Sequence, residues 1–265
     1  MQLVLWTILI LTPLVLGGVL ARMIFRNPRG DFDSGIAFLI GRAYVKLVHN
    51  LRIHNREHIP TDLKPGPIII VANHTAGIDP ILIQASCPFE IRWIMASDMR
   101  ATGLEWFWKW QKIIFVGRDR NSTAVGLRTA IEHLQDHGVV GIFPEGGLER
   151  PPRHILPFHP GFAMLVRKTG ARILPVFIDD TPQIDPAWAS LWKPSRSTIS
   201  FGPLLSFDRA TPANEITEKV RTYFIERSGW PVNDHPDQVD IDSGKTMGPY
   251  ARRLQTPEEN ERSVA

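Results

Sequence analysis

The chain has 265 residues, of which 43% are hydrophobic and 22% are charged. This balance is typical of a globular protein with a sizeable core and excludes an extended disordered chain. The net charge of +3 and the pI of about 9.2 favour contact with an anionic surface or anionic ligands, and no zinc-finger spacing or other nucleic-acid motif is present. The single cysteine, Cys87, cannot form an internal disulfide, and we expect it to be buried and unreactive.

The segment from Met1 to Ala21 contains no charged side chain. At about 1.5 Å per residue, a helix of this length could cross roughly 30 Å of hydrocarbon. Pro13 and the pair Gly17-Gly18 weaken a straight helix, so a segment embedded in one leaflet is the alternative. Three arginines follow the apolar run: Arg22, Arg26 and Arg29. Because a signal peptide carries its basic residues before the apolar run, we expect a retained membrane anchor with the next domain on the cytoplasmic side.

A second amphipathic helix is predicted from Ile36 to Leu51. Its apolar residues have helical spacing, and Arg42 and Lys46 lie four residues apart on one side. The helix could lie along a membrane interface or on the surface of the folded domain, because periodicity does not distinguish the two. Residues 1–51 are therefore predicted to form a membrane anchor and an amphipathic helix.

Beyond residue 51, short β-rich runs alternate with helical stretches. The predicted strands cover Pro67 to Ala72, Ile91 to Ala96, Lys112 to Val116, Val139 to Pro144, Ala171 to Ile178 and Thr198 to Gly202. The predicted helices cover Ile81 to Ala85, Thr102 to Trp110, Ser122 to His137, Gly161 to Thr169 and Ala213 to Ile225. This alternation predicts an α/β fold over residues 52–230, with a mixed, largely parallel sheet covered by helices. Residues 231–265 form a polar tail that we expect to be partly disordered.

A histidine and an aspartate follow the first of the predicted strands of this domain, in the stretch V-A-N-H-T-A-G-I-D-P. Asp79 followed by Pro80 is a helix-start signal, with an aspartate cap and proline at the first helical position. His74 would then lie in the loop between strand and helix, where the Asp79 carboxylate could orient its imidazole as a general base. In the alternative interpretation, Asp79 only caps the helix and His74 is a polar turn residue.

Three further pieces follow at or near the ends of later strands, where side chains of an α/β fold gather around a site. In chain order they read F-V-G-R-D-R, F-P-E-G-G and I-L-P-V-F. They supply Arg118 and Arg120, then Glu145, Gly146 and Gly147, and then Pro175.

This ordered set resembles the glycerolipid acyltransferase family, whose bacterial type member is 1-acylglycerol-3-phosphate acyltransferase. The similarity runs from about Asn55 to about Gly202. The resemblance implies that His74 and Asp79 are the catalytic pair of the family's H-x-x-x-x-D motif. It also implies a membrane-bound enzyme, here on the cytoplasmic side of a bacterial inner membrane.

The resemblance also implies roles for the later motifs. Arg118 would hold the phosphate of the acceptor, and the segment Glu145, Gly146 and Gly147 would belong to the acceptor site. Pro175 would shape the acyl pocket. The family's third motif usually continues Glu-Gly-Thr-Arg, whereas here Gly147 and a leucine follow Gly146. Arg120 and Arg150 are candidates for the compensating cations.

The resemblance implies transfer of a fatty acyl group from acyl-CoA or acyl carrier protein to the hydroxyl of a lysophospholipid. The first expected acceptor is 1-acylglycerol-3-phosphate, which would give phosphatidic acid. The family needs no metal and no prosthetic group. Because the third motif is altered, another lysolipid or an amino-lipid acceptor is an alternative, and so is a non-catalytic lipid-binding protein with the same fold. Membrane lipids are expected partners, and nucleic acid is not.

Two smaller clusters have competing interpretations. Trp106, Trp108 and Trp110 favour a membrane contact, because indole rings prefer the headgroup region, over packing in the core. His133 and His137 have the spacing of a metal pair, but without a third ligand in the sequence we expect a solvated helix face instead.

Overall fold

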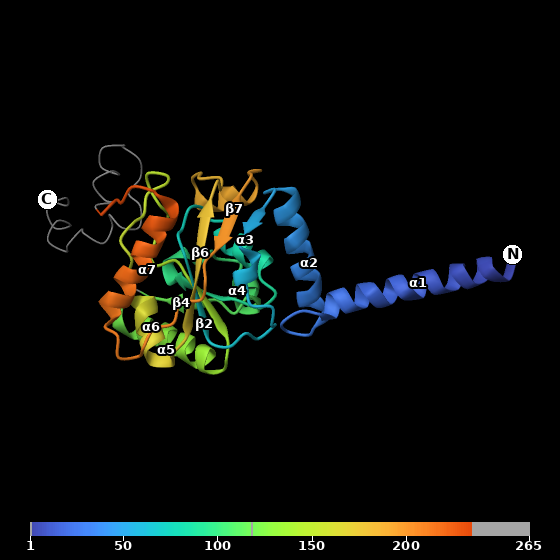
Figure 1. The fold of residues 1–265 in the computed structure, drawn as a ribbon, viewed down its shortest axis with the longest axis horizontal. Helices are drawn as coiled ribbons and strands as arrows, with labels where there is room; N and C mark the ends of the chain where they lie inside the picture. Colours follow the sequence, from blue (N-terminus) through green and yellow to red (C-terminus); the bar gives the residue numbers. More distant parts are fainter. Residues whose placement is uncertain (1, 118, 235–265) are drawn as a thin grey trace.

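The computed structural model describes residues 2–117 and 119–234. The polar tail predicted over residues 231–265 lies almost entirely outside the described residues. The chain begins with two helices, α1 (Gln2–Phe25) and α2 (Phe32–Leu47). Figure 1 shows α1 projecting from the body of the molecule and α2 lying against the body. Within the described part of the chain, no helix combines the length and the apolar character that crossing a membrane requires. The membrane anchor predicted over residues 1–51 stays a prediction.

The connection between α1 and α2 is fixed by side chains of the intervening turn. Asp31 caps α2 by accepting the Ser34 N–H at 2.7 Å, which is the role of an aspartate at this position. This cap explains why α2 begins at Phe32 rather than at the predicted Ile36. A Cβ on Gly35 would lie 2.0 Å from the carbonyl oxygen of Ile24, so the two helices cross closely only because position 35 is glycine.

The domain is built on a seven-stranded sheet with the order β1-β7-β6-β2-β5-β3-β4. The strands are β1 (Arg52–His54), β2 (Ile68–Ala72), β3 (Arg92–Ala96), β4 (Ile114–Val116), β5 (Val139–Ile142), β6 (Arg172–Asp179) and β7 (Thr198–Phe201). All neighbouring pairs are parallel except β6 and β7, which are antiparallel. The predicted α/β fold with a mixed, largely parallel sheet is therefore confirmed.

Helices cover both faces of the sheet. The remaining α-helices are α3 (Asp79–Ser86), α4 (Glu105–Trp110), α5 (Arg120–Gln135), α6 (Gly161–Thr169) and α7 (Ala213–Ser228). Short 3₁₀ turns are η1 (Arg56–His58), η2 (Ser97–Met99) and η3 (Ala187–Leu191). Successive strand residues point to opposite faces, so β2 contributes to two cores. Its residues Ile68 and Ile70 pack with α2 and α3, while Ile69 and Val71 pack with α5, α6 and α7.

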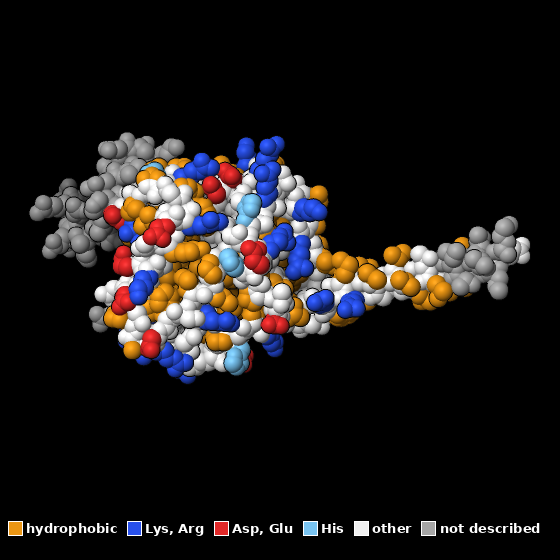
Figure 2. Space-filling view, viewed as in Figure 1, with side chains coloured by type: hydrophobic (Ala, Val, Ile, Leu, Met, Phe, Trp, Pro, Cys, Tyr) orange, Lys and Arg blue, Asp and Glu red, His pale blue; other side chains and the backbone are white. Residues whose placement is uncertain are grey.

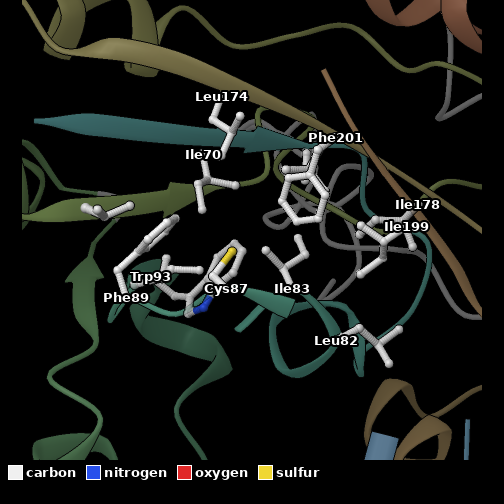
Figure 3. Packing of buried hydrophobic residues seen from close by; sticks show 14 of the residues in the cluster. Ile70, Leu82, Ile83, Cys87, Phe89, Trp93, Leu174, Ile178, Ile199 and Phe201 are labelled. Atoms are coloured by element: carbon white, nitrogen blue, oxygen red, sulfur yellow. The ribbon is translucent and has the colours of Figure 1, made fainter. Parts of the chain in front are cut away.

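Figure 3 shows the first of these cores, with strand residues such as Ile70 and Leu174 facing Ile83 of α3. Cys87 is buried in this core, as expected from the sequence. Burial also raises the pKa of its thiol. The thiolate is the reactive form of cysteine, so this group is inert in the folded protein.

Strand β1 was not predicted from the sequence. It has only three residues, R-I-H, and its pairing partner β7 lies far along the chain, with Ile53 opposite Ile199. A short strand without an apolar run carries no periodic signal of its own. Pairing with a distant strand is what defines it.

The solvated helix face predicted for His133 and His137 is wrong for His133. This ring is largely enclosed next to Gly138, where a Cβ would lie 2.2 Å from it. Burial, followed by the nearby charge of Arg92, lowers the pKa of His133 to about 4. His137 lies after the end of α5 and is exposed. Among the described residues, no group of three metal-binding side chains is present.

The three tryptophans of the α4 region have unequal environments. Trp106 is exposed, whereas Trp108 and Trp110 are half-buried. The guanidinium of Arg29 lies 5.0 Å from the centre of the Trp110 ring, so this tryptophan contacts the turn between α1 and α2. The membrane contact predicted for the group stays a prediction.

Candidate active site

The site begins where β2 ends. Asn73, directly after β2, donates its Nδ2–H to the Ile178 carbonyl at 2.9 Å and accepts the Ile178 N–H on Oδ1 at 2.8 Å. The asparagine side chain thus replaces one step of the hydrogen-bond ladder between β2 and β6. Asn73 is fully buried, and its amide fixes the point from which the next loop leaves the sheet.

The carboxylate of Asp79 organises that loop. Its Oδ2 accepts the main-chain N–H groups of Thr75 at 2.7 Å and Ala76 at 2.8 Å, and lies 3.0 Å from Nδ1 of His74. The Thr75 hydroxyl donates to Oδ1 at 3.1 Å. Asp79 is the first residue of α3, and Ile78 occupies the cap position. The predicted helix cap is therefore wrong by one residue, because this carboxylate holds the turn before the helix instead.

Asp79 determines the tautomer of His74. An ionised carboxylate can only accept hydrogen bonds, so Nδ1 of the imidazole carries the proton and Nε2 presents a lone pair. Among the described residues none forms a hydrogen bond with Nε2. The Asp79 side chain is fully buried, whereas 20% of the His74 side chain is exposed. This arrangement leaves a basic nitrogen available to a substrate hydroxyl.

Aromatic rings support the imidazole. The His74 ring is stacked on Phe143, with centroids 4.0 Å apart and planes at 14°. Phe143 is in turn stacked on Trp93, with centroids 5.0 Å apart. The ring of His74 is therefore fixed by Asp79 at Nδ1 and by Phe143 on one face.

The loop after β5 binds the backbone of His74. Glu145 is fully buried; its Oε2 accepts the His74 N–H at 3.0 Å and its Oε1 accepts the Leu156 N–H at 3.4 Å. Burial raises the pKa of Glu145 well above its ordinary value. Gly146 has φ of 69° in the following turn, a conformation that favours glycine. Gly147 follows it, half-buried.

Sequence reasoning missed Glu149. Its main-chain N–H donates to the carbonyl oxygen of His74 at 2.7 Å. Its buried side chain accepts the Arg153 N–H at 3.0 Å and the Gln183 amide at 2.5 Å, both on Oε1. Burial raises the pKa of Glu149 to about 7, and the nearby charges of Asp79 and Asp179 add to the effect. No spacing in the sequence signals this role, because the partners come from separate loops.

Residues 50–179 match a family model described as Acyltransferase. Residues 50–179 are therefore an acyltransferase domain. The chain shares the fold of a solved structure, the crystal structure of the 1-acyl-sn-glycerophosphate acyltransferase PlsC from Thermotoga maritima. The two chains are 24% identical with a TM-score of 0.59, over 72% of this chain and 76% of that one. A comparison with curated proteins found no match.

The three arginines predicted for the acceptor site of this acyltransferase, Arg118, Arg120 and Arg150, lie in different parts of the chain's structure or outside its described residues. Arg118 lies outside the described residues, and Arg120 begins α5. Arg150 donates to the Glu149 carbonyl at 2.7 Å and to Asp185 at 3.3 Å. Its guanidinium is therefore engaged by the protein itself.

Pro175, the residue predicted for the acyl pocket of the acyltransferase, lies in β6. It is buried opposite Val71 of β2, and its carbonyl accepts the Gly202 N–H at 2.8 Å. Proline cannot donate to the sheet ladder. Pro175 lies on β6, the strand next to β2, which leads to His74. Its role in an acyl pocket stays a prediction.

Proposed function

We propose that this acyltransferase moves a fatty acyl group from a thioester of coenzyme A or acyl carrier protein to the hydroxyl of a lysophospholipid. The first proposed acceptor is 1-acylglycerol-3-phosphate, with phosphatidic acid as the product. The observation that carries the proposal is the pair formed by His74 and the buried Asp79, 3.0 Å apart. The shared fold with the Thermotoga PlsC, a 1-acyl-sn-glycerophosphate acyltransferase, supports the choice of acceptor.

In the proposed reaction, Nε2 of His74 takes the proton of the acceptor hydroxyl as its oxygen attacks the thioester carbonyl. The resulting tetrahedral intermediate collapses by breaking the carbon–sulfur bond, which leaves the acyl ester. The imidazolium returns its proton to the departing thiolate, so the enzyme ends unchanged. Asp79 stabilises the imidazolium while it exists and stays ionised throughout.

The proposed reaction requires no covalent acyl-enzyme. The acceptor oxygen is the nucleophile, so the protein has to supply a base, an orientation and a place for the developing oxyanion. His74 supplies the base. The contacts from Glu145 and Glu149 to the backbone of His74 supply its orientation.

A second candidate is transfer to another lysolipid or to an amino-lipid. The observation that favours it concerns the cations near the third motif. Arg150 is paired with Asp185 at 3.3 Å, and Arg153 with Asp179 at 3.2 Å and Asp180 at 2.9 Å. A phosphate monoester is best held by several free cations. An acceptor with a zwitterionic or amine-bearing headgroup fits these paired arginines better.

Competition between acceptors separates the two candidates. The purified protein is given labelled acyl-CoA, or labelled acyl carrier protein in a parallel reaction, with lysophosphatidate, lysophosphatidylethanolamine and an amino-lipid alcohol present together. Preference for lysophosphatidate supports the first candidate, and preference for either other acceptor supports the second. If the thioester is consumed with none of the acceptors, the result would favour a lipid-binding protein that lacks activity.

The catalytic assignment is tested by His74→Ala. We expect transfer to fall by about 10²–10⁴-fold, the usual contribution of a general base, while the protein remains folded. The matched control is His54→Ala, because His54 is exposed on β1 at the far edge of the sheet. Near-normal turnover by His74→Ala would refute the assignment.

We further propose that the enzyme works at a membrane, with its catalytic domain on the cytoplasmic side of a bacterial inner membrane. The charge pattern supports this location, since arginines follow the apolar N-terminal residues. Figure 2 shows hydrophobic side chains along the described part of α1 and lysine and arginine side chains where α1 meets the body.

A further inference from the structure

Two tryptophans on η3 and just after it are exposed. Trp188 is 63% exposed and Trp192 is 74% exposed, although both are large apolar side chains that normally lose most of their surface on folding. Exposed apolar groups that gather at one place mark an interaction site. Leu47, at the end of α2, is 81% exposed.

This segment is held firmly against the end of α2. The Tyr44 hydroxyl donates to the Leu191 carbonyl, and Nδ1 of His49 lies 2.8 Å from the Ser195 hydroxyl. The Ser197 N–H also donates to the His49 carbonyl at 3.0 Å. The two tryptophans are therefore presented on an ordered part of the domain next to α2. We call Trp188, Trp192 and Leu47 the tryptophan surface.

Basic residues are close in sequence to the tryptophan surface. Lys46 precedes Leu47 on α2, Lys193 and Arg196 follow Trp192, and all three are exposed. Figure 2 shows lysine and arginine side chains gathered on the side of the molecule that α2 occupies. Indole rings favour the headgroup region of a bilayer, and exposed Lys and Arg are attracted by anionic lipids. This chemistry fits a lipid surface better than it fits a protein partner.

The main chain of η3 lies directly against the catalytic loop. A Cβ on Gly77, between His74 and Asp79, would lie 2.4 Å from the Ala187 carbonyl oxygen. The Thr75 hydroxyl lies 2.5 Å from the Thr181 hydroxyl, in the segment that leads into η3. A membrane bound at the tryptophan surface would therefore lie against a segment that contacts the loop carrying His74.

We propose that the tryptophan surface binds an anionic lipid bilayer and holds the His74 loop at the interface where a lipid acceptor enters. Contact with the bilayer is separate from any anchoring by α1. Only the kinetic consequence rests on the proposed function, because it requires the acceptor to be a membrane lipid.

The contact is tested by fluorescence of the full-length chain. Trp192→Cys can be labelled selectively with an NBD group, because Cys87 is buried. We expect a blue shift and brighter emission on addition of vesicles that contain phosphatidylglycerol, and a weaker response to vesicles of phosphatidylcholine alone. The matched control is Val125→Cys on α5, an exposed position of a helix that packs on the opposite face of the sheet, and its emission should not change. Unchanged emission at position 192, or equal responses at both positions, would overturn the proposal.

The kinetic consequence is tested with the double variant Trp188→Ser and Trp192→Ser. We expect the apparent KM for a vesicle-embedded acceptor to rise by about tenfold, with kcat for a short-chain, water-soluble acceptor unchanged. The double variant Val125→Ser and Met164→Ser, on α5 and α6, should match the wild type with both acceptors. Equal loss with both acceptors would contradict an interfacial role. Absence of transfer by the wild type would contradict the proposed function instead, and the fluorescence result would still stand.

Discussion

The main-chain N–H of Glu149 donates a hydrogen bond of 2.7 Å to the carbonyl oxygen of His74. The carboxyl group of Glu145 accepts the N–H of the same histidine at 3.0 Å. The loop after β5 therefore binds both main-chain polar groups of the expected base. Any change that shifts this loop should move the imidazole, even though neither glutamate contacts the ring.

Glu149→Gln should make stability less dependent on pH. Burial raises the pKa of Glu149 from 4.5 to about 7, so the folded state holds this proton more tightly than the unfolded chain does. Below the unfolded pKa both states are protonated, and the shift has no effect. As the pH rises from about 4.5 to about 7 the unfolded chain ionises first, and the wild type loses about 3 kcal/mol through this group.

Glutamine keeps the shape of the side chain and removes this titration. We therefore expect the difference in unfolding free energy, Glu149→Gln minus wild type, to grow between pH 4.5 and pH 7 and then to level off. Urea denaturation at a series of pH values measures it. The control is Glu132→Gln, since Glu132 is exposed on α5. A difference that is constant across this range would show that the carboxyl group is ionised in the folded protein.

Asp79→Asn and Asp79→Ala should have different effects. Asparagine can keep one oxygen at the position of Oδ2, where it accepts the N–H groups of Thr75 and Ala76. The loop should survive, but a neutral amide cannot stabilise the imidazolium, so kcat should fall by about 10²–10⁴-fold. Alanine leaves these buried donors unpaired, at about 1–3 kcal/mol each, and should also lower stability. Turnover and chemical denaturation of both variants check this, and equal destabilisation by the two would contradict it.

Long apolar runs made most of the sheet predictable. The expected strand over Pro67 to Ala72 is β2, and α6 has the predicted bounds Gly161–Thr169. Such segments are buried on a regular face, so hydrophobic periodicity reports them directly. The strand β1 has no such run, because it is defined by its pairing with β7.

The pair His74 and Asp79 was also predictable, because the two residues are close in sequence and the loop between them is short. The contacts of Glu149 were not. They depend on the relative positions of the loops containing Arg153 and Gln183. The arrangement of the strands in the sheet determines those positions. The contact between Arg150 and Asp185 also joins separate loops. The sequence did not reveal this contact, so it suggested Arg150 as a compensating cation.

Gly77→Ala should displace the catalytic loop. The added Cβ would lie 2.4 Å from the Ala187 carbonyl oxygen and 3.3 Å from the Ser190 hydroxyl. Because a backbone atom blocks the methyl group, the loop or η3 has to move, and a misplacement of about 1 Å can reduce turnover by about 100-fold. Gly161→Ala is the matched control, since a Cβ there meets nothing within 4 Å. Turnover of the two variants is compared at equal folded fraction, and equal activities would mean that η3 yields without disturbing His74.

Phe143→Leu should lower kcat more than it lowers stability. Leucine keeps most of the apolar volume but removes the flat face that lies 4.0 Å from the His74 ring, a contact worth about 0.5–1.5 kcal/mol. With that face gone the imidazole can rotate about its contact with Asp79, so its Nε2 is less often aligned with the acceptor hydroxyl. We expect kcat to fall by about 5–10-fold, as loss of orientation does, with KM for both substrates nearly unchanged.

The matched control for Phe143 is Phe177→Leu. Phe177 packs edge-on against Trp230 with centroids 4.8 Å apart, in the core on the other face of the sheet. It should lose similar packing energy without touching His74. Steady-state kinetics and thermal unfolding of the two variants decide the matter. If both variants reduce kcat equally, the stacked ring acts through general stability, and if only Phe143→Leu does, the ring orients the base.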